Sequence, residues 1–147
     1  MVTPNVERML RRVVLDVFDD RVEVAWDKQP GAPYIHRASL SAKHGAARRA
    51  VGLSAASEWV DITILDLDVS ATLFEYDDES YMEAILRELA LVADAYLRGE
   101  GLVEQKRGIF RSRPVLRIIV NGNEWILGRR TSSIHYPKDA STEGSPN

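Results

Sequence analysis

The sequence has 147 residues, 45% of them hydrophobic and 28% charged, a composition typical of one soluble globular domain. It contains no cysteine, which excludes disulfides, thiolate chemistry and zinc sites built on cysteine. Charged side chains interrupt the N-terminal segment, and no apolar run approaches the roughly 18 residues of a membrane span. We therefore expect no signal peptide, no membrane association and a cytoplasmic location.

The formal net charge of −3 conceals segments of opposite sign. Residues 28–57 carry a net charge of +5, residues 58–104 one of −11, and residues 105–138 one of +7. Two explanations are open at this point. The acidic and basic segments can be neighbours in the fold and neutralise each other, or an acidic face is left free and steers a basic partner toward it.

The N-terminal part of the chain predicts a helix followed by strands. Thr3-Pro4 is typical of an N-cap and first helical residue, and apolar residues at helical spacing extend the helix to about Leu15. Alternation of apolar and polar residues around Val22–Trp26 then predicts a half-buried strand. After a break at Pro30–Pro33, a second strand is expected from Tyr34 to Leu40. Residues 41–57 are small, polar and positively charged, and predict a loop with a short helical piece.

Two strands are expected between Trp59 and Leu73. Val60, Ile62 and Ile64 alternate with polar residues, but the phase of the alternation changes at Leu65. A one-residue shift would move every side chain to the opposite face, so a turn or a bulge must intervene. We favour a tight turn at Asp66-Leu67-Asp68, which makes the segment a hairpin.

The clearest element is an amphipathic helix from Asp77 to Gly101. Asp77 and Asp78 can accept hydrogen bonds from first-turn amides, and Ser80 and Glu83 have the spacing of a capping box. Acid–base pairs four residues apart are expected on its polar face, and Gly99 or Gly101 suits the left-handed residue that ends it. The residues of its apolar stripe are Met82, Ile85, Leu86, Leu89, Val92, Ala93, Tyr96 and Leu97, with paired charges Glu83–Arg87 and Asp94–Arg98 opposite.

The C-terminal part predicts further strands. Residues 102–106 and 109–111 have strand composition, and residues 115–120 and 123–129 flank Asn121-Gly122, the preferred pair for a type I′ hairpin turn. That turn places Val120, Ile118 and Leu116 opposite Asn123, Trp125 and Leu127, on a face expected to receive the central helix. The N-terminal helix is a candidate to cover part of the opposite face.

We therefore predict an α+β protein with a mainly antiparallel sheet of about five to seven strands, on which an N-terminal helix and a long central helix pack. One domain is expected over residues 1–136, large enough to bury roughly two-thirds of its unfolded surface. The polar residues 137–147 predict a disordered tail.

Catalytic motifs of the common kinds are absent, and the three histidines lie far apart in the sequence. The Asp66-x-Asp68 pair lacks the glycine and closing glutamate of a calcium loop. We therefore predict no catalytic residue, no cofactor and no metal ion.

The residues that stand out are acids that precede the central helix, together with one tryptophan. Asp66, Asp68, Glu75 and Asp78 are expected to lie near one end of the sheet, although helix capping also accounts for Asp78. Trp59 is out of phase with the buried residues that follow it, as an exposed interface anchor would be. These five residues are the predicted partner-binding site.

Two short patterns carry a resemblance to a known class of protein. Ala95-Tyr96-Leu97-x-Gly99, and then Asn121-Gly122-x-x-Trp125 after a basic strand, are similar to what occurs in small α+β immunity proteins of bacterial, actinobacterial-type polymorphic toxin systems. The resemblance covers roughly the last third of the chain and transfers no site residue. It implies an immunity protein or antitoxin that is not an enzyme and that neutralises a cognate toxin by direct binding.

An alternative is a small-ligand-binding or enzymatic α+β domain whose pocket lies between the sheet and the loop at residues 41–57. The net negative charge and the few aromatic residues among the basic strands argue against nucleic-acid binding.

Overall fold

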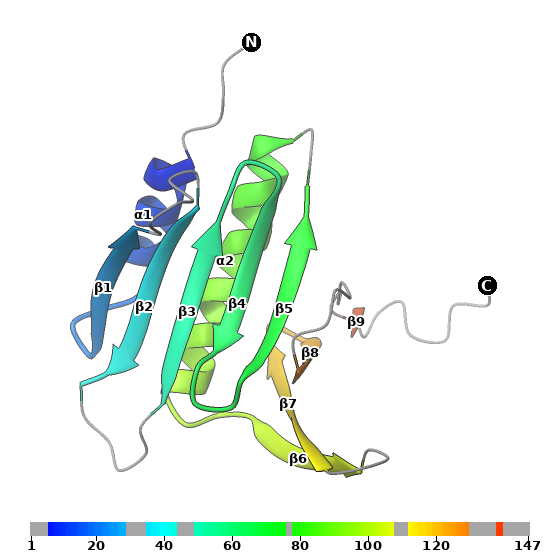
Figure 1. The fold of residues 1–147 in the computed structure, drawn as a ribbon. Helices are drawn as coiled ribbons and strands as arrows, with labels where there is room; N and C mark the ends of the chain where they lie inside the picture. Colours follow the sequence, from blue (N-terminus) through cyan, green and yellow to red (C-terminus); the bar gives the residue numbers. More distant parts are fainter. Residues whose placement is uncertain are drawn as a thin grey trace, which may run out of the picture.

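A computed structural model describes residues 6–28, 35–43, 49–75, 78–107, 112–129 and 138–139. In this part of the chain, nine strands form an antiparallel sheet, and two helices pack on one of its faces (Figure 1). The elements are α1 (Val6–Val17), β1 (Val22–Lys28), β2 (His36–Ala42), β3 (Ala50–Ala55), β4 (Trp59–Ile64), β5 (Val69–Phe74), α2 (Glu79–Leu97), β6 (Leu102–Arg107), β7 (Ser112–Val120), β8 (Asn123–Arg129) and β9 (Lys138–Asp139). The predicted α+β class and both predicted helices are confirmed.

The strand order is β1-β2-β3-β4-β5-β8-β7-β6, and β9 pairs with β8. Strands β1 to β5 form a meander, in which each strand pairs with the next one along the chain. Strands β6 to β8 form a second meander, which joins the first where Val69 and Ser70 pair with Arg129 and Gly128. The described strands outnumber the predicted five to seven.

The loop predicted over residues 41–57 is wrong for residues 41–42, which belong to β2, and for residues 50–55, which form β3. This strand lies in the interior of the sheet between β2 and β4, and its residues 51–55 are all buried. Residues 44–48 of the predicted loop lie outside the described residues. Small side chains made β3 look like a loop, since Gly, Ser and Ala have low intrinsic preference for strands and tertiary packing overrides that preference here.

Both helices pack on the same face of the sheet and enclose the core. Alternate residues of β3, β4 and β5 contribute to it, as do α2 and the inner face of the β7–β8 hairpin. Helix α1 lies beside α2, where Arg12 donates to Glu83 with an Nε–Oε2 distance of 3.1 Å and Arg87 pairs with Asp16 at 3.0 Å. The expectation that α1 covers the opposite face of the C-terminal hairpin is wrong, because its contacts are with α2, β2 and β3.

Helix α2 begins and ends with specific capping contacts. Asp78 is the N-cap and accepts a hydrogen bond from the backbone N–H of Tyr81 at 3.0 Å. The predicted capping box starting at Ser80 is wrong by two positions, and Asp77 lies outside the described residues. At the other end, the N–H groups of Gly99 and Glu100 bond to earlier carbonyls in a Schellman motif, with Gly99 at a φ of 99°. The predicted ion pairs Glu83–Arg87 and Asp94–Arg98 are both present.

Both predicted hairpins are present. Residues 65–68 form the turn between β4 and β5, where Asp68 has a φ of 55°. Asn121 and Gly122 have φ values of 51° and 80°, as a type I′ turn requires, and the predicted register of β7 and β8 is confirmed. Of the predicted tail, residues 137 and 140–147 lie outside the described residues, and Lys138–Asp139 pair with Glu124 and Asn123. No described helix is long and apolar enough to cross a membrane.

Candidate functional site: a polar groove on the outer face of the sheet

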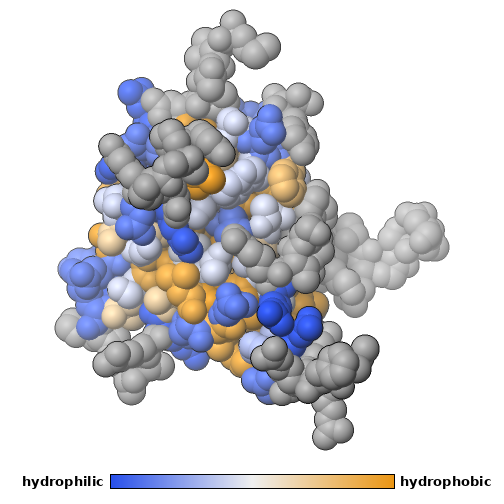
Figure 2. All heavy atoms as spheres, in the orientation of Figure 1, coloured by the Kyte–Doolittle hydropathy of each residue, from blue (hydrophilic) through white to orange (hydrophobic). Residues whose placement is uncertain are grey.

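The face of β2–β5 that points away from α1 and α2 is lined by small and polar side chains; we call it the outer face. One row of paired positions crosses it from Arg37 through Ser54 and Asp61 to Thr72. A neighbouring row runs from Ser39 through Gly52 and Thr63 to Ser70. Figure 2 looks onto this face and shows residues of intermediate and low hydropathy over its middle.

This face contains a cavity of about 350 Å³, which we call the groove. Its volume falls at the lower end of the range usual for small-molecule sites. The side chains that line it come from β2, β3, β4 and β5 and from the segments that flank them. They are Ile35, Arg37, Ser54, Trp59, Asp61, Thr63, Asp68 and Ser70.

Asp61 is the buried acid of the groove, with only 2% of its surface exposed. Its carboxylate accepts a hydrogen bond from the hydroxyl of Thr63 at 2.9 Å and a second one from the hydroxyl of Thr72. Burial of a carboxylate is costly unless such donors compensate for the lost water. Thr63 in the same strand and Thr72 opposite it in β5 therefore supply the donors that this buried carboxylate needs in the wall of the groove.

Arg37 is the cation of the groove, and its charge is not compensated in the same way. Its buried Nε has no hydrogen-bond acceptor, and the described part of the chain contains no ion pair of Arg37. Asp27 lies directly across the β1–β2 pair, but its carboxylate accepts from the hydroxyl of Ser39 at 2.8 Å instead. A buried donor of this kind has lost its hydrogen bond to water without forming another, which costs free energy.

Gly52 explains how Arg37 reaches this position. A Cβ atom built on Gly52 would lie 2.5 Å from Nη2 and 2.7 Å from Nε of Arg37, so the guanidinium would have to move if any other residue replaced this glycine. The guanidinium thus lies directly over the backbone of β3, in space that only a glycine leaves free. Gly52 is therefore a positioning residue for Arg37.

The five predicted site residues do not form one cluster. Trp59 and Asp68 both line the groove, Trp59 half-buried and Asp68 exposed. Asp66 lies in the β4–β5 turn with Asp68 but does not line the groove. Its carboxylate accepts hydrogen bonds from the backbone N–H of Ala50 at 2.9 Å and from the hydroxyl of Tyr96. Asp78 caps α2, and Glu75 accepts from the backbone N–H of Asp78 at 3.2 Å.

Six of the residues that line the groove were not predicted from the sequence: Ile35, Arg37, Ser54, Asp61, Thr63 and Ser70. A signal was present for Asp61, because it alternates with Val60 and Ile62 on the polar face of a predicted strand. No local signal pointed to Arg37, since its place depends on a glycine in the next strand.

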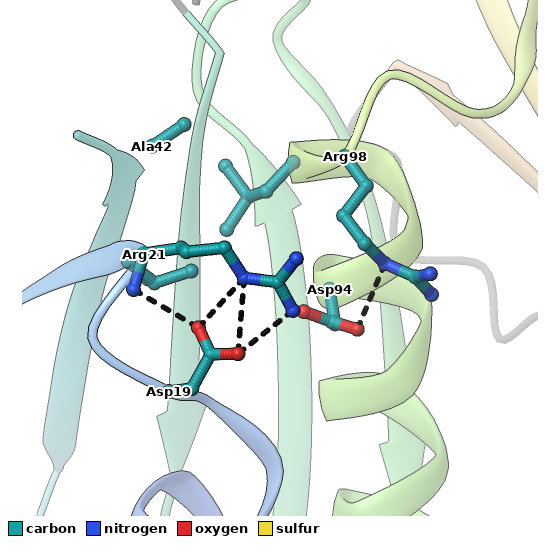
Figure 3. A pocket seen from close by; sticks show the side chains of 7 residues that line it. Asp19, Arg21, Ala42, Asp94 and Arg98 are labelled. Atoms are coloured by element: carbon teal, nitrogen blue, oxygen red, sulfur yellow. Dashed lines mark hydrogen bonds and ion pairs between the residues drawn. The ribbon is translucent and has the colours of Figure 1, made fainter. Parts of the chain in front are cut away.

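A second hollow, of about 380 Å³, lies between the start of β1, the end of β2 and the C-terminal end of α2 (Figure 3). Its charged side chains are paired with each other: Arg21 with Asp19 at 2.7 Å and Arg98 with Asp94 at 3.1 Å. Hydrogen bonds from the side chain and backbone of Arg21 lower the pKa of the Asp19 carboxyl to about 2. Because these charges already have partners, this hollow is a weaker candidate than the groove.

Among the described residues, no group of three or more His, Asp or Glu side chains is arranged to hold a metal ion. His36 is in β2, whereas His44 and His135 lie outside the described residues.

No protein-family model matches the sequence, and comparisons with curated proteins and with solved structures returned no match.

Proposed function

We propose that the protein is a non-enzymatic protein-binding module that receives a partner protein on the outer face of its sheet, as an immunity protein or antitoxin receives its cognate toxin. The observation that carries the proposal is the groove itself, a hollow in a sheet face whose lining includes a half-buried tryptophan, Trp59, and an exposed acid, Asp68. Interfaces of this kind concentrate their binding energy in a few aromatic and charged residues that lie in pockets.

The charge of the groove supports a basic partner. Of its three charged residues, Asp61 and Asp68 are negative and Arg37 is positive. No ion pair of Asp68 is found among the described residues, so its carboxylate is available to a partner. Acids at a rim act mainly on the association rate, because they attract a basic surface before contact. Trp59 supplies the apolar contact that slows dissociation.

The first test mixes the purified protein with the product of the reading frame next to its own. We expect a complex with a nanomolar dissociation constant, equivalent to about −12 kcal/mol, and protection of cells that express that product. Absence of both the complex and the protection would contradict the antitoxin role.

Variants then locate the interface on such a complex. Trp59→Ala is expected to weaken binding by at least about tenfold, the usual effect of removing an aromatic anchor. Trp26→Ala is the matched control, since Trp26 lies on the side of the helices with Arg11 over its ring at 4.5 Å. Equal loss of affinity in both variants, or in neither, would place the interface elsewhere.

Asp68→Asn removes one charge while keeping a side chain that tolerates the positive φ at this position. We expect slower association with a weaker dependence on salt, and no change for Glu88→Gln on the exposed side of α2. An unchanged association rate in Asp68→Asn would remove Asp68 from the interface.

A further inference from the structure

We propose that the groove is also a binding site for a small molecule that carries a carboxylate, and that Arg37 is the residue that recognises it. This inference does not depend on the protein partner. It uses the one charged side chain of the groove that the proposed function leaves without a role.

The groove contains an acid that has hydrogen-bond donors and a cation that has no ion-pair partner among the described residues. The carboxylate of Asp61 is already provided with hydroxyl donors, whereas Arg37, which also lines the groove, forms no ion pair with a described residue. Arginine presents its donors in a flat fork that fits the two oxygens of a carboxylate. The chemistry missing from the groove is therefore that of an anion.

The two acids of the groove restrict the charge that a bound anion can carry. Arg37 shares the groove with two acids, Asp61 and Asp68, so a second negative charge on the ligand would be repelled at short range. A monoanionic carboxylate is compatible with this surrounding, and a doubly charged phosphate is not. The hydroxyls of Ser54, Thr63 and Ser70 add neutral hydrogen-bonding groups to the same walls.

Ile35 and Trp59 line the groove beside the polar residues, and its volume of about 350 Å³ exceeds what a carboxylate alone would fill. An apolar or aromatic body attached to the carboxylate would pack on these two side chains. The ligand class is thus a small amphipathic carboxylate.

Benzoate is a suitable probe, with benzamide as its uncharged counterpart and inorganic phosphate as the competing anion. The buried Nε–H of Arg37 and the indole N–H of Trp59 can be followed by ¹H–¹⁵N NMR, with assignments taken from the Arg37→Lys and Trp59→Phe variants. We expect benzoate to shift both signals in a saturable way, with a dissociation constant in the millimolar range appropriate to so small a ligand. Benzamide and phosphate are expected to bind at least tenfold more weakly.

Three variants of the chain sharpen the test. Arg37→Lys keeps the charge but loses the planar fork, and should weaken benzoate binding by about tenfold. Gly52→Ala displaces the guanidinium and should have the same effect with Arg37 itself intact. Arg98→Lys, in the second hollow, is the control and should leave the benzoate titration unchanged.

Several results would overturn the proposal. Equal binding of benzamide would show that the ring alone is recognised, and equal binding of phosphate would remove the preference for a carboxylate. No saturable shift with benzoate, combined with a protein complex that is lost in Arg37→Lys, would mean that the partner protein supplies the acceptor. If Gly52→Ala does not fold, Arg37→Lys alone decides the outcome. Benzoate binding in the absence of any protein complex would refute only the proposed function.

Discussion

The hydroxyl of Tyr96 in α2 donates a hydrogen bond to the carboxylate of Asp66 in the β4–β5 turn. The same carboxylate accepts from the backbone N–H of Ala50, and Arg49 lies over the Tyr96 ring at 4.4 Å from its centroid. Arg49 also donates to the carbonyl oxygens of Tyr96 and Glu100 at 2.9 and 3.1 Å, at the end of the helix. This cluster ties α2 to the sheet and gives Asp66 a structural role.

Removing either partner of this hydrogen bond should destabilise the protein. We expect Tyr96→Phe to lower the free energy of unfolding by about 1–2 kcal/mol, because a bond to a charged acceptor is lost. Asp66→Ala should cost more, since it also deprives the Ala50 amide of its acceptor. Urea unfolding of the two single variants and the double variant gives the coupling energy, and additive losses would contradict a direct interaction.

Tyr96 also predicts a loss of stability at alkaline pH. Burial raises the pKa of its phenol above the ordinary value, and the hydrogen bond to Asp66 and the negative charge of that residue raise it further. The folded state therefore keeps a proton that the unfolded state releases above about pH 10, so stability is constant below that pH and falls above it. Unfolding curves from about pH 9 to about pH 11 should show this fall in the native protein and a smaller one in Tyr96→Phe.

Glu83 should make the stability of the protein fall at acid pH. Its hydrogen bond with Arg12, followed by that with Arg87, lowers the pKa of the carboxyl. Stability from this cluster is therefore present above the ordinary pKa of about 4.3 and is lost as the pH falls below it. Because both arginines are partly exposed, the loss should be small. Glu83→Gln should show a weaker dependence of melting temperature on acid pH, and an identical dependence would contradict the assignment.

The N-cap of α2 predicts a clear ranking of substitutions. Asp78→Ala leaves the Tyr81 N–H without its acceptor and should destabilise the protein by about 1 kcal/mol. Asp78→Asn and Asp78→Ser supply another acceptor and should lose far less. Thermal unfolding distinguishes the three, and equal effects would mean that the charge of Asp78 matters more than its hydrogen bond.

Substitution of Gly122 should destabilise the protein through backbone conformation alone. A Cβ atom would meet nothing within 4 Å, but the φ of 80° is unfavourable for alanine. We expect Gly122→Ala to destabilise by about 1 kcal/mol. Gly128→Ala in β8 is the matched control, because it has equal space and no positive φ, and it should be neutral or slightly stabilising. Similar losses in both variants would rule out backbone strain as the cause.

The elements predicted correctly are those marked by local signals. The Asn121-Gly122 turn, the phase change after Ile64 and the helical stripe of α2 each depend on neighbouring residues alone. The predictions that failed depend on distant ones. Ser80 and Glu83 do not form a capping box because Asp78 is the N-cap and Ser80 lies inside the helix. Strand β3 resembled a loop because it consists largely of Gly, Ser and Ala, and its place in the sheet depends on β2 and β4.

The same distinction between local and distant signals applies to the residues of the candidate site. Trp59 and Asp68 are the two predicted residues that line the groove. Trp59 was singled out by its phase, and Asp68 as one of the acids that precede the central helix. The charge blocks of the sequence were partly explained by pairing across the fold, as in Arg117 with Glu104 at 2.9 Å. The groove could not be predicted, because its walls belong to four strands whose order only the structure supplies.

The joint between β5 and β8 bears on how the chain folds. On either side of it, strands that are neighbours in the sheet are also neighbours in the sequence, so each meander can form by successive hairpins with short loop closures. Pairing of Ser70 with Gly128 instead closes a chain segment that includes the whole of α2. Only two residue pairs stabilise this contact between β5 and β8. Amide exchange should therefore be fastest at this joint among the interior strand pairs, and folding should be limited by the docking of two preformed halves.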